Sequence, residues 1–585
     1  MADAWQTTYE SRDDLKVFGD NALGLFALGL KFGIEDLVTV GTESITDGSD
    51  DKKCDIVYVD KDDGIAVVAQ CYFSTKAKQE APSNKAADLN TAISWLIQRP
   101  LNELPERIVS AAQQLRDGIT NNEIKEIHIW YIHNLPESNN VLKELKAVED
   151  SAKAAVTHQY PDSRISIHAL EVGKAKINEW YDETLSPILV NDEFEIDTKI
   201  GFEIDGPEWR AYVTTVEARF LYRQYKKYKT QLFSANVRDY LGSRISDSNI
   251  NNGIKKTAEN EPDNFWVFNN GLTVLVNDFN VMSDNKSKNN KIVIKGMSIV
   301  NGAQTTGAIG ALNKTPASSV RVPVRFIKTK NPNIVLDIIQ FNNSQNKVTA
   351  SDFRSTDKIQ KRIKDEVSKI PSAEYEGGRR GGFGDLIRRR PNLLPSYTVG
   401  QSLASFHGDP VIAYNQKQNI WIEDSLYSKY FNENTTGSHI VFAYSLVRAV
   451  EQRKVELIEK EKKSPQTLTT DEENQIKFFR KRGSNFLLVS AISSCLETFT
   501  NRKISNLFRI SFGEKKSPKE AQKLWSDLID VTIPLCNQLD EALNDGLKNT
   551  KLVENVISKF RGLISVTAKS NAAIFKSFSK NIVIK

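Results

Sequence analysis

The chain has 585 residues, of which 40% are hydrophobic and 26% charged, a composition that excludes a disordered or fibrous protein. Its 78 basic and 74 acidic residues give a net charge of +4, and this near-balance does not by itself call for nucleic acid. At roughly 150 residues per domain, the length predicts three or four domains with ample core.

The first residues, the hydropathy and the cysteines argue against several classes of protein. Residues 1–10 lack the basic start and apolar run of a signal peptide, and the chain has no apolar stretch of about 18 residues. The four cysteines show no CxxC or Cys/His zinc spacing, so neither structural zinc nor a disulfide framework is expected. We therefore expect a cytoplasmic protein without membrane contact.

The first segment, residues 1–190, is predicted to be an α/β domain. It opens with a helix that is apolar on most sides, and two short strands joined by a turn of hairpin composition follow. Further helices and strands alternate beyond the hairpin. The expected helices cover 15–30, 84–96 and 141–155, and the expected strands cover 55–59, 65–70, 127–132 and 165–170.

The rest of the chain divides into two further predicted domains. Residues 191–394 mix helices with strands at 265–268, 272–276, 291–294 and 322–327, after an acidic stretch at 191–205. Residues 395–585 show long apolar-periodic stretches and are predicted to be mostly α-helical. The predicted fold class is therefore multidomain α/β, with a helical carboxyl-terminal domain.

The first 63 residues hold fifteen acids against six bases, a net charge of −9. Asp55 begins the first hairpin strand and Gln70 ends the second. This pattern resembles the metal-dependent nucleases of the PD-(D/E)xK type, which have a restriction-endonuclease-like fold and bind a divalent cation through hard oxygen ligands. By this resemblance Asp55 and Gln70 are candidate catalytic residues and Mg²⁺ ligands, with Glu43 or Asp20 as a third ligand.

The expected lysine position of that pattern holds Tyr72, which carries no positive charge at neutral pH. Lys76, Lys78 or Lys85 would have to supply the charge, and Lys85, at the start of the following helix, is the best placed of them. The alternative is that Asp55 only begins a hairpin, Gln70 only closes a sheet edge, and the acidic residues are solvated.

The middle segment contains three motifs rich in amides and hydroxyls, together with a cluster of neutral amides at 341–348. The turn at 299–306 follows a predicted strand and could open a helix whose amino-terminal N–H groups bind a phosphate. The alternative is a buried amide network that fixes loop geometry. The candidate phosphate- or nucleic-acid-binding residues are Arg238, Asn269, Asn270, Asn301, Gln304 and Thr305.

These motifs resemble those of the AIPR family, the bacterial abortive-infection phage-resistance proteins. They read Asn-Val-Arg-Asp-Tyr-Leu at 236–241, Phe-Trp-Val-Phe-Asn-Asn-Gly-Leu-Thr at 265–273 and Ile-Val-Asn-Gly-Ala-Gln-Thr-Thr at 299–306. The resemblance covers roughly residues 200–430. It implies a role in antiviral defence and a nuclease-like amino-terminal domain, from which the tyrosine at position 72 departs.

Two basic segments are further candidates for contact with nucleic acid. In residues 219–229 basic residues alternate with tyrosines, which suits either base stacking or an amphipathic helix with an aromatic core stripe. Residues 376–390 carry a net charge of +3 in a glycine-rich setting. There Arg379 and Arg380 would contact phosphate, or else acidic groups of the amino-terminal domain.

Two functions remain open from the sequence. The first is an antiphage effector that cleaves nucleic acid with Mg²⁺, using Asp55 and Gln70 as ligands and Lys85 to stabilise charge. The second is a non-catalytic sensor that binds a nucleotide or nucleic acid through the middle segment and has a degenerate nuclease domain. The sequence is compatible with a homodimer but does not predict one.

Overall fold

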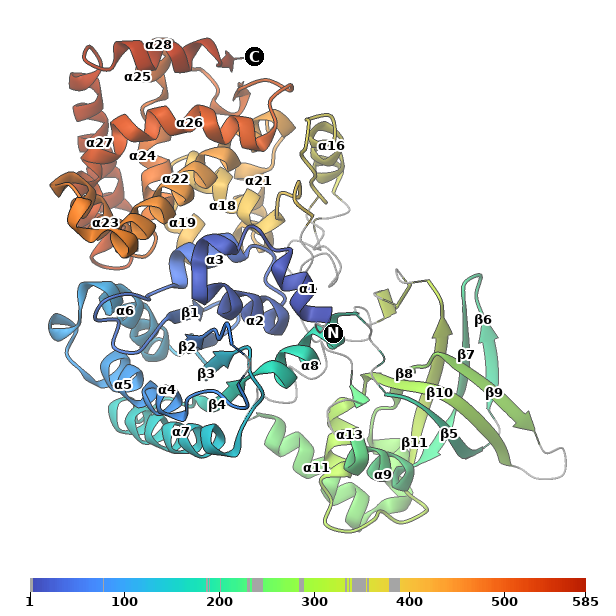
Figure 1. Cartoon of the computed structure of the whole chain (residues 1–585). Coiled ribbons are helices and arrows are strands. Elements are labelled where there is room, and N and C mark those ends of the chain that lie inside the picture. Colours follow the sequence, from blue (N-terminus) through green and yellow to red (C-terminus); the bar gives the residue numbers. More distant parts are fainter. Residues whose placement is uncertain are drawn as a thin grey trace. The chain divides into compact units, whose positions relative to one another are not determined.

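A computed structural model of the chain shows two compact units, each described here by itself (Figure 1). It describes residues 4–76, 78–185, 190–199, 201–228, 246–283, 289–331, 357–377 and 390–584, and single positions at 188, 232, 233, 334, 335, 337, 338 and 354. The first unit draws its described residues from Met1–Ile177, Thr349–Gly381 and Asp385–Lys585, and the second from Asn178–Val348. The mixed α/β class is confirmed.

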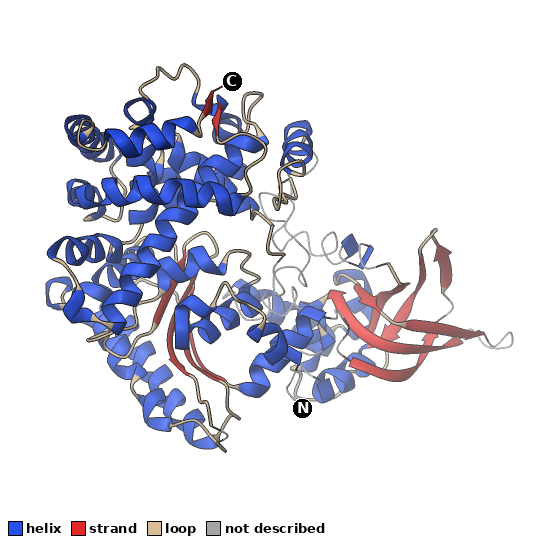
Figure 2. Cartoon of the chain, turned by 45° about the horizontal axis from the view of Figure 1, so that its top comes forward, coloured by secondary structure: helices blue, strands red, loops and turns tan. Residues whose placement is uncertain are grey.

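A four-stranded sheet, drawn as red arrows among blue helices in Figure 2, lies in the first unit. Its strand order is β1-β2-β3-β4, and the strands are labelled in Figure 1. Strands β1 (Ile56–Asp60) and β2 (Ile65–Tyr72) form the predicted antiparallel hairpin, closed by a turn in which Gly64 has a φ of 71°. The next two strands run parallel to β2, so each is reached through helices. They are β3 (Glu126–His133) and β4 (Ser166–Val172).

Helices surround this sheet. A Cβ at Gly24 of α2 (Ala22–Phe32) would lie 2.5 Å from Ile56 Cδ1, so glycine lets this helix contact the hairpin directly. Apolar residues of α5, α6 and α7 share one core cluster with strand residues such as Val68 and Ile129. The remaining helices of this part are α1 (Ala4–Glu10), α3 (Leu37–Ser44), α4 (Ser83–Ala87), α5 (Leu89–Ile93), α6 (Glu106–Thr120) and α7 (Asn139–Gln159).

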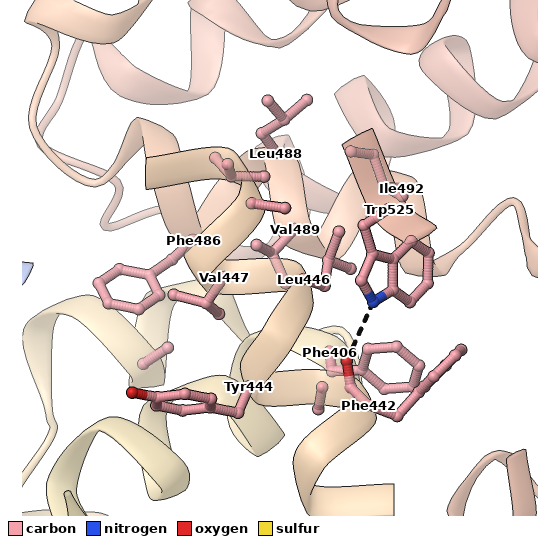
Figure 3. Packing of buried hydrophobic residues seen from close by; sticks show 14 of the residues in the cluster. Phe406, Phe442, Tyr444, Leu446, Val447, Phe486, Leu488, Val489, Ile492 and Trp525 are labelled. Carbon is pink, nitrogen blue, oxygen red and sulfur yellow. Dashed lines mark hydrogen bonds between the residues drawn. The ribbon is translucent and has the colours of Figure 1, made fainter. Parts of the chain in front are cut away.

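The last third of the chain is helical, as predicted, and belongs to the same unit. Its centre is α22 (Gly437–Lys463), with α24 (Ser484–Ser493), which is buried on every side as its apolar sequence requires. Figure 3 shows Trp525 of α26 in this core, where its indole N–H donates to the Phe442 carbonyl at 3.2 Å. The other elements are α16 (Lys358–Val367), α18 (Ser396–Phe406), α19 (Pro410–Asn415), α20 (Asn419–Ile422), α21 (Asp424–Tyr430), α23 (Thr470–Arg480), α25 (Leu496–Thr500), α26 (Pro518–Thr532), α27 (Thr550–Thr567), α28 (Ala572–Lys580), β12 (Ile510–Ser511) and β13 (Val583–Ile584).

A buried histidine, His439, meets the half-buried His407 in this helical core. The Nε2 atoms of His407 and His439 lie 3.0 Å apart, and His439 Nδ1 lies 2.9 Å from the Ile510 carbonyl oxygen. Because a carbonyl only accepts, Nδ1 of His439 donates to it, and its Nε2 accepts from His407. Burial lowers the pKa of His439 to about 4, so this ring is neutral in the folded protein.

Buried polar contacts join the helical part to the part that holds the four-stranded sheet. Arg448 of α22 donates to Glu451 at 2.6 Å, to Thr39 at 3.1 Å and to Asp36, which caps the start of α3. Arg482, which lies between α23 and α24, donates to the backbone carbonyl of Val57 in β1. The segments predicted as the first and third domains therefore lie in one compact unit.

The second unit is built on a larger sheet, with the order β5-β10-β8-β11-β7-β6 and β9 paired to β10. Among the named strands of this sheet, β8 and β11 pair in parallel, and the other described strand pairs are antiparallel. Its strands are β5 (Val190–Lys199), β6 (Phe202–Asp205), β7 (Trp209–Glu217), β8 (Leu272–Leu275), β9 (Asp278–Ser283), β10 (Asn289–Asn301) and β11 (Arg321–Thr329). Its helices are α9 (Ala218–Tyr228), α11 (Ser246–Asn260), α12 (Phe265–Phe268) and α13 (Ala303–Gly310), and α8 (Lys174–Leu185) spans the boundary between units.

One strand prediction in this unit is wrong. Residues 265–268 form the short helix α12, which follows a 3₁₀ turn that starts at Pro262. Only Phe265 of the four is buried, whereas Trp266, Val267 and Phe268 are exposed. The acidic stretch at 191–205 also contributes strands, because every second residue of β5 from Phe194 onward faces the core.

Candidate functional site

The anchor of the candidate site is Asp55, which directly precedes β1. Its backbone N–H donates to the Ala69 carbonyl at 2.9 Å, and its Oδ2 accepts from the Cys71 N–H at 2.6 Å. Both contacts go to β2, to the residues on either side of Gln70. The carboxylate is buried and fixed, and no described residue donates a hydrogen bond to its Oδ1.

Two further carboxylates meet Asp55. Asp47 and Asp51 come from the loop between α3 and β1, and one oxygen from each of the three residues lies within 4.8 Å of the others. The loop turns back on itself through positive φ angles at Asp50 and Lys52, and Asp51 accepts from the Lys53 N–H at 2.8 Å. We call Asp47, Asp51 and Asp55 the acidic trio.

Burial raises the pKa of Asp55 to about 7, and the negative charges of Asp47 and Asp51 act in the same direction. The Cys71 hydrogen bond and the positive charge of Lys85 act against this shift. A carboxyl that ionises near neutral pH gains strongly from an added positive charge. The three side chains could therefore hold a metal ion.

The structure brings only some of the predicted ligands together. Gln70 is 5% exposed, and its side-chain oxygen has no hydrogen-bond partner among the described residues. Glu43 points elsewhere: its carboxylate accepts from the Gly483 N–H at 3.0 Å and lies 3.4 Å from the Lys454 ammonium. In place of Glu43, the geometry offers Asp47 and Asp51.

Positive charge gathers around Tyr72, at the position where the nuclease pattern has lysine. Lys78 Nζ donates to the Tyr72 hydroxyl at 2.6 Å, and this bond lowers the pKa of Tyr72. Lys85 Nζ lies 5.5 Å from the centre of the Tyr72 ring, and its charge also reaches Asp55. The positive charge of Lys85 therefore acts on both Tyr72 and Asp55.

Asp47 is held by contacts from three segments. Its Oδ2 accepts from Asn21 Nδ2 at 2.9 Å and from Lys462 Nζ at 2.9 Å, while its backbone carbonyl accepts from Arg107 at 2.8 Å. The bond to Asp47 raises the pKa of Lys462. Sequence reasoning missed these partners, which come from the start of α2, from α6 and from the end of α22.

Two of the family-like motifs meet in the second unit. Asn301 pairs with Thr273 between β10 and β8, and Gly302 follows with a φ of 94°. A Cβ at Gly302 would lie 2.1 Å from Leu272 Cδ2 and 3.1 Å from the Gly271 carbonyl oxygen. Glycine is thus required where the turn at 299–306 crosses the start of β8.

The candidate binding residues around this crossing differ in their surroundings. Asn270 and Asn301 are exposed, whereas Asn269 donates from its side chain to the Phe265 carbonyl at 3.1 Å and braces α12. Gln304 is half-buried and Thr305 is buried, both within α13. The structure thus brings these two motifs together where β10 pairs with β8.

The basic segments are only partly described. In α9, Tyr222, Tyr225 and Tyr228 pack against the core of the second unit, and Lys227 pairs with Asp192 at 3.1 Å. These contacts favour the amphipathic alternative for residues 219–228. Arg238, Arg379 and Arg380 lie outside the described residues, as do residues 341–348.

Other groups give less chemistry. The four cysteines are free and buried. No helix in the described ranges combines the length and the apolar character needed to cross a membrane. Lys364 of α16 pairs with Glu376 at 2.7 Å, and Arg390 pairs with the same carboxylate group at 2.8 Å, so these charges offset one another.

Comparison with known proteins identifies a family for most of the chain's second half. No curated protein and no solved structure matches the chain significantly. The family model described as AIPR protein matches residues 233–533, a range that contains all three motifs. The match covers more than half of the 585 residues, and the chain therefore belongs to the AIPR family.

Proposed function

We propose that the protein is an antiphage effector of abortive infection that cleaves nucleic acid with a divalent cation held by the acidic trio. Membership of the AIPR family supports the defence role. The observation that carries the nuclease proposal is the convergence of three carboxylates at Asp55, whose backbone and side chain are bonded to the residues on either side of Gln70. The antiparallel hairpin with a parallel third strand also suits a PD-(D/E)xK-like fold.

The residues present fit a hard divalent cation. Asp47, Asp51, Asp55 and Gln70 offer only oxygen atoms, which Mg²⁺ prefers. When bound, such an ion stabilises negative charge that develops on a phosphodiester. Lys85 adds a second positive charge next to Tyr72, and this charge favours the ionised form of Asp55.

The chain's own residues then have separate tasks. Cys71 and Ala69 fix the orientation of Asp55 through the backbone of β2, so its free Oδ1 is the atom offered to the cation. Near neutral pH the Asp55 carboxyl exchanges a proton readily, because its pKa is about 7. The ionised form of Asp55 is the one that would hold a cation.

The test uses the purified full chain with plasmid DNA, single-stranded DNA and RNA, in Mg²⁺, in Mn²⁺ and in a chelator. We expect metal-dependent cleavage by the wild type and loss of it in Asp55→Asn. The matched control is Asp50→Asn, which removes the same charge from the same loop at an exposed residue outside the trio. If Asp55→Asn and the wild type behave alike, both in cleavage and in a phage plaque assay, the proposal is wrong.

One observation favours a second candidate function, a non-catalytic sensor. Tyr72 replaces the lysine of active nucleases, and Lys78 is engaged with its hydroxyl. In this case the amides near the crossing of β8 and β10 would bind a nucleotide or a nucleic-acid end. Calorimetric titration with nucleotides and short duplexes, on the wild type and on Asn301→Ala/Gln304→Ala, tests it, and absence of binding by the wild type would eliminate it.

A further inference from the structure

We infer that Lys462, in the last turn of α22, is a positioning residue of the metal site, supplied to the acidic trio by the helical third of the chain. The inference rests on the proposed function and adds to it a residue 415 positions away from Asp47. No feature of the nuclease pattern points to it.

The contact geometry carries the first step. Lys462 Nζ and Asn21 Nδ2 each lie 2.9 Å from the same oxygen, Asp47 Oδ2. No described residue donates to the other oxygen, Oδ1. Asp47 is thus held like Asp55, with one oxygen bound by the protein and one left for a ligand. Hydrogen bonds of this kind fix the orientation of metal-ligating carboxylates.

The neighbourhood of Lys462 shows that its position is built rather than incidental. The preceding residue, Glu461, accepts from Arg107 at 3.1 Å, and the same guanidinium donates to the Asp47 carbonyl at 2.8 Å. Arg480 of α23 binds the other oxygen of Glu461. The end of α22 therefore acts on Asp47 by two routes. Lys462 binds the Asp47 side chain directly, and Glu461 holds Arg107, which binds the Asp47 backbone carbonyl.

Charge gives the second step. Three carboxylates within 4.8 Å repel one another, and Asp55 is buried. The lysine expected on β2 is absent, so part of the compensating positive charge must come from elsewhere. Lys462 brings it from the AIPR-matched segment, whereas the trio and Gln70 precede that segment. The site is therefore incomplete without the helical third.

An experiment without nucleic acid separates this inference from the proposed function. Mn²⁺ is titrated into the full chain by calorimetry, for the wild type, Lys462→Ala, Lys462→Arg and Lys463→Ala. Lys463 is the matched control, because it is the next residue of the same helix end and pairs with Glu459 away from the trio. We expect Lys462→Ala to bind Mn²⁺ about 10- to 100-fold more weakly, Lys462→Arg to recover part of the loss, and Lys463→Ala to match the wild type.

Each outcome has one meaning. If the wild type binds no Mn²⁺, the proposed metal site fails and the inference fails with it. If the wild type binds Mn²⁺ and Lys462→Ala binds it equally well, only the inference fails. Tighter binding by Lys462→Ala would also overturn it, because Lys462 would then compete with the metal. Circular dichroism and urea unfolding of each variant establish that the weaker binding does not come from a loss of fold.

Discussion

The buried contact between α22 and α3 gives a quantitative prediction. Arg448 is 8% exposed and donates to Glu451, Thr39, Tyr444 and Asp36. Replacing it by alanine removes the guanidinium that Asp36 and Glu451 share. Burial already raises the pKa of Glu451 against the attraction of Arg448.

The size of the effect follows from the burial. Removing one partner of a buried ion pair costs about 3–5 kcal/mol, because the remaining charge stays desolvated. We therefore expect Arg448→Ala to lower the free energy of unfolding by about that amount. Arg453 on the same helix is the control, since its nearest acidic oxygens lie at 3.9 and 4.0 Å. Its replacement by alanine should cost only about 0–1 kcal/mol.

The measurement is urea unfolding followed by far-ultraviolet circular dichroism, because most helices of the chain lie in the first unit. The double variant Arg448→Met/Glu451→Gln, which removes both charges of the pair, should recover part of the lost stability. If Arg448→Ala shifts the transition no further than Arg453→Ala does, the contact does not stabilise the unit, and the reasoning from burial is refuted.

Two further predictions concern a glycine and a histidine. Gly302→Ala should destabilise the second unit by about 1–3 kcal/mol in thermal unfolding, because the φ of 94° and the 2.1 Å approach to Leu272 both oppose a Cβ. Gly253→Ala is the control, since a Cβ there would meet no atom within 4 Å and should not destabilise the unit. Equal effects of the two substitutions would contradict this explanation. The pKa of His439 is about 4 in the folded protein and about 6.5 in the unfolded chain, so only the unfolded chain binds a proton at this residue between these pH values. The free energy of unfolding is therefore unaffected by this group above about pH 6.5 and falls by about 3 kcal/mol as the pH drops to about 4. The fall in unfolding free energy between about pH 7 and about pH 5 should be smaller for His439→Gln than for the wild type, and an unchanged fall would remove His439 as its cause.

The sequence predicts the hairpin well and the rest of the site poorly. Two apolar runs on either side of Lys61–Gly64 allow little besides a hairpin, and the start of β1 then singles out Asp55. Asp47 joins Asp55 only because positive φ angles at residues 50, 52 and 53 turn the loop back. Such backbone angles at aspartate and lysine leave no clear signal in the sequence.

The misassigned α12 and the missed lysine have other causes. A run of four apolar residues fits a strand or a single helical turn equally well, so residues 265–268 could not be decided by periodicity. Lys462 lies 415 residues from Asp47, and neither composition nor spacing indicates contacts over that distance. The same holds for Arg448 and Asp36, which join predicted domains that the sequence presents as separate.

The contact of Arg482 with β1 has a consequence for dissecting the molecule. β1 is one of the two edge strands of its sheet, and beyond its bridge between Ile45 and Ile56 the Val57 carbonyl accepts from Arg482, which covers it against an incoming strand. Unprotected edges recruit other chains and seed aggregation. A fragment cut before the helical third would lose this cover, so insolubility of residues 1–190 produced alone would reflect an uncapped β-edge and not a defective sequence.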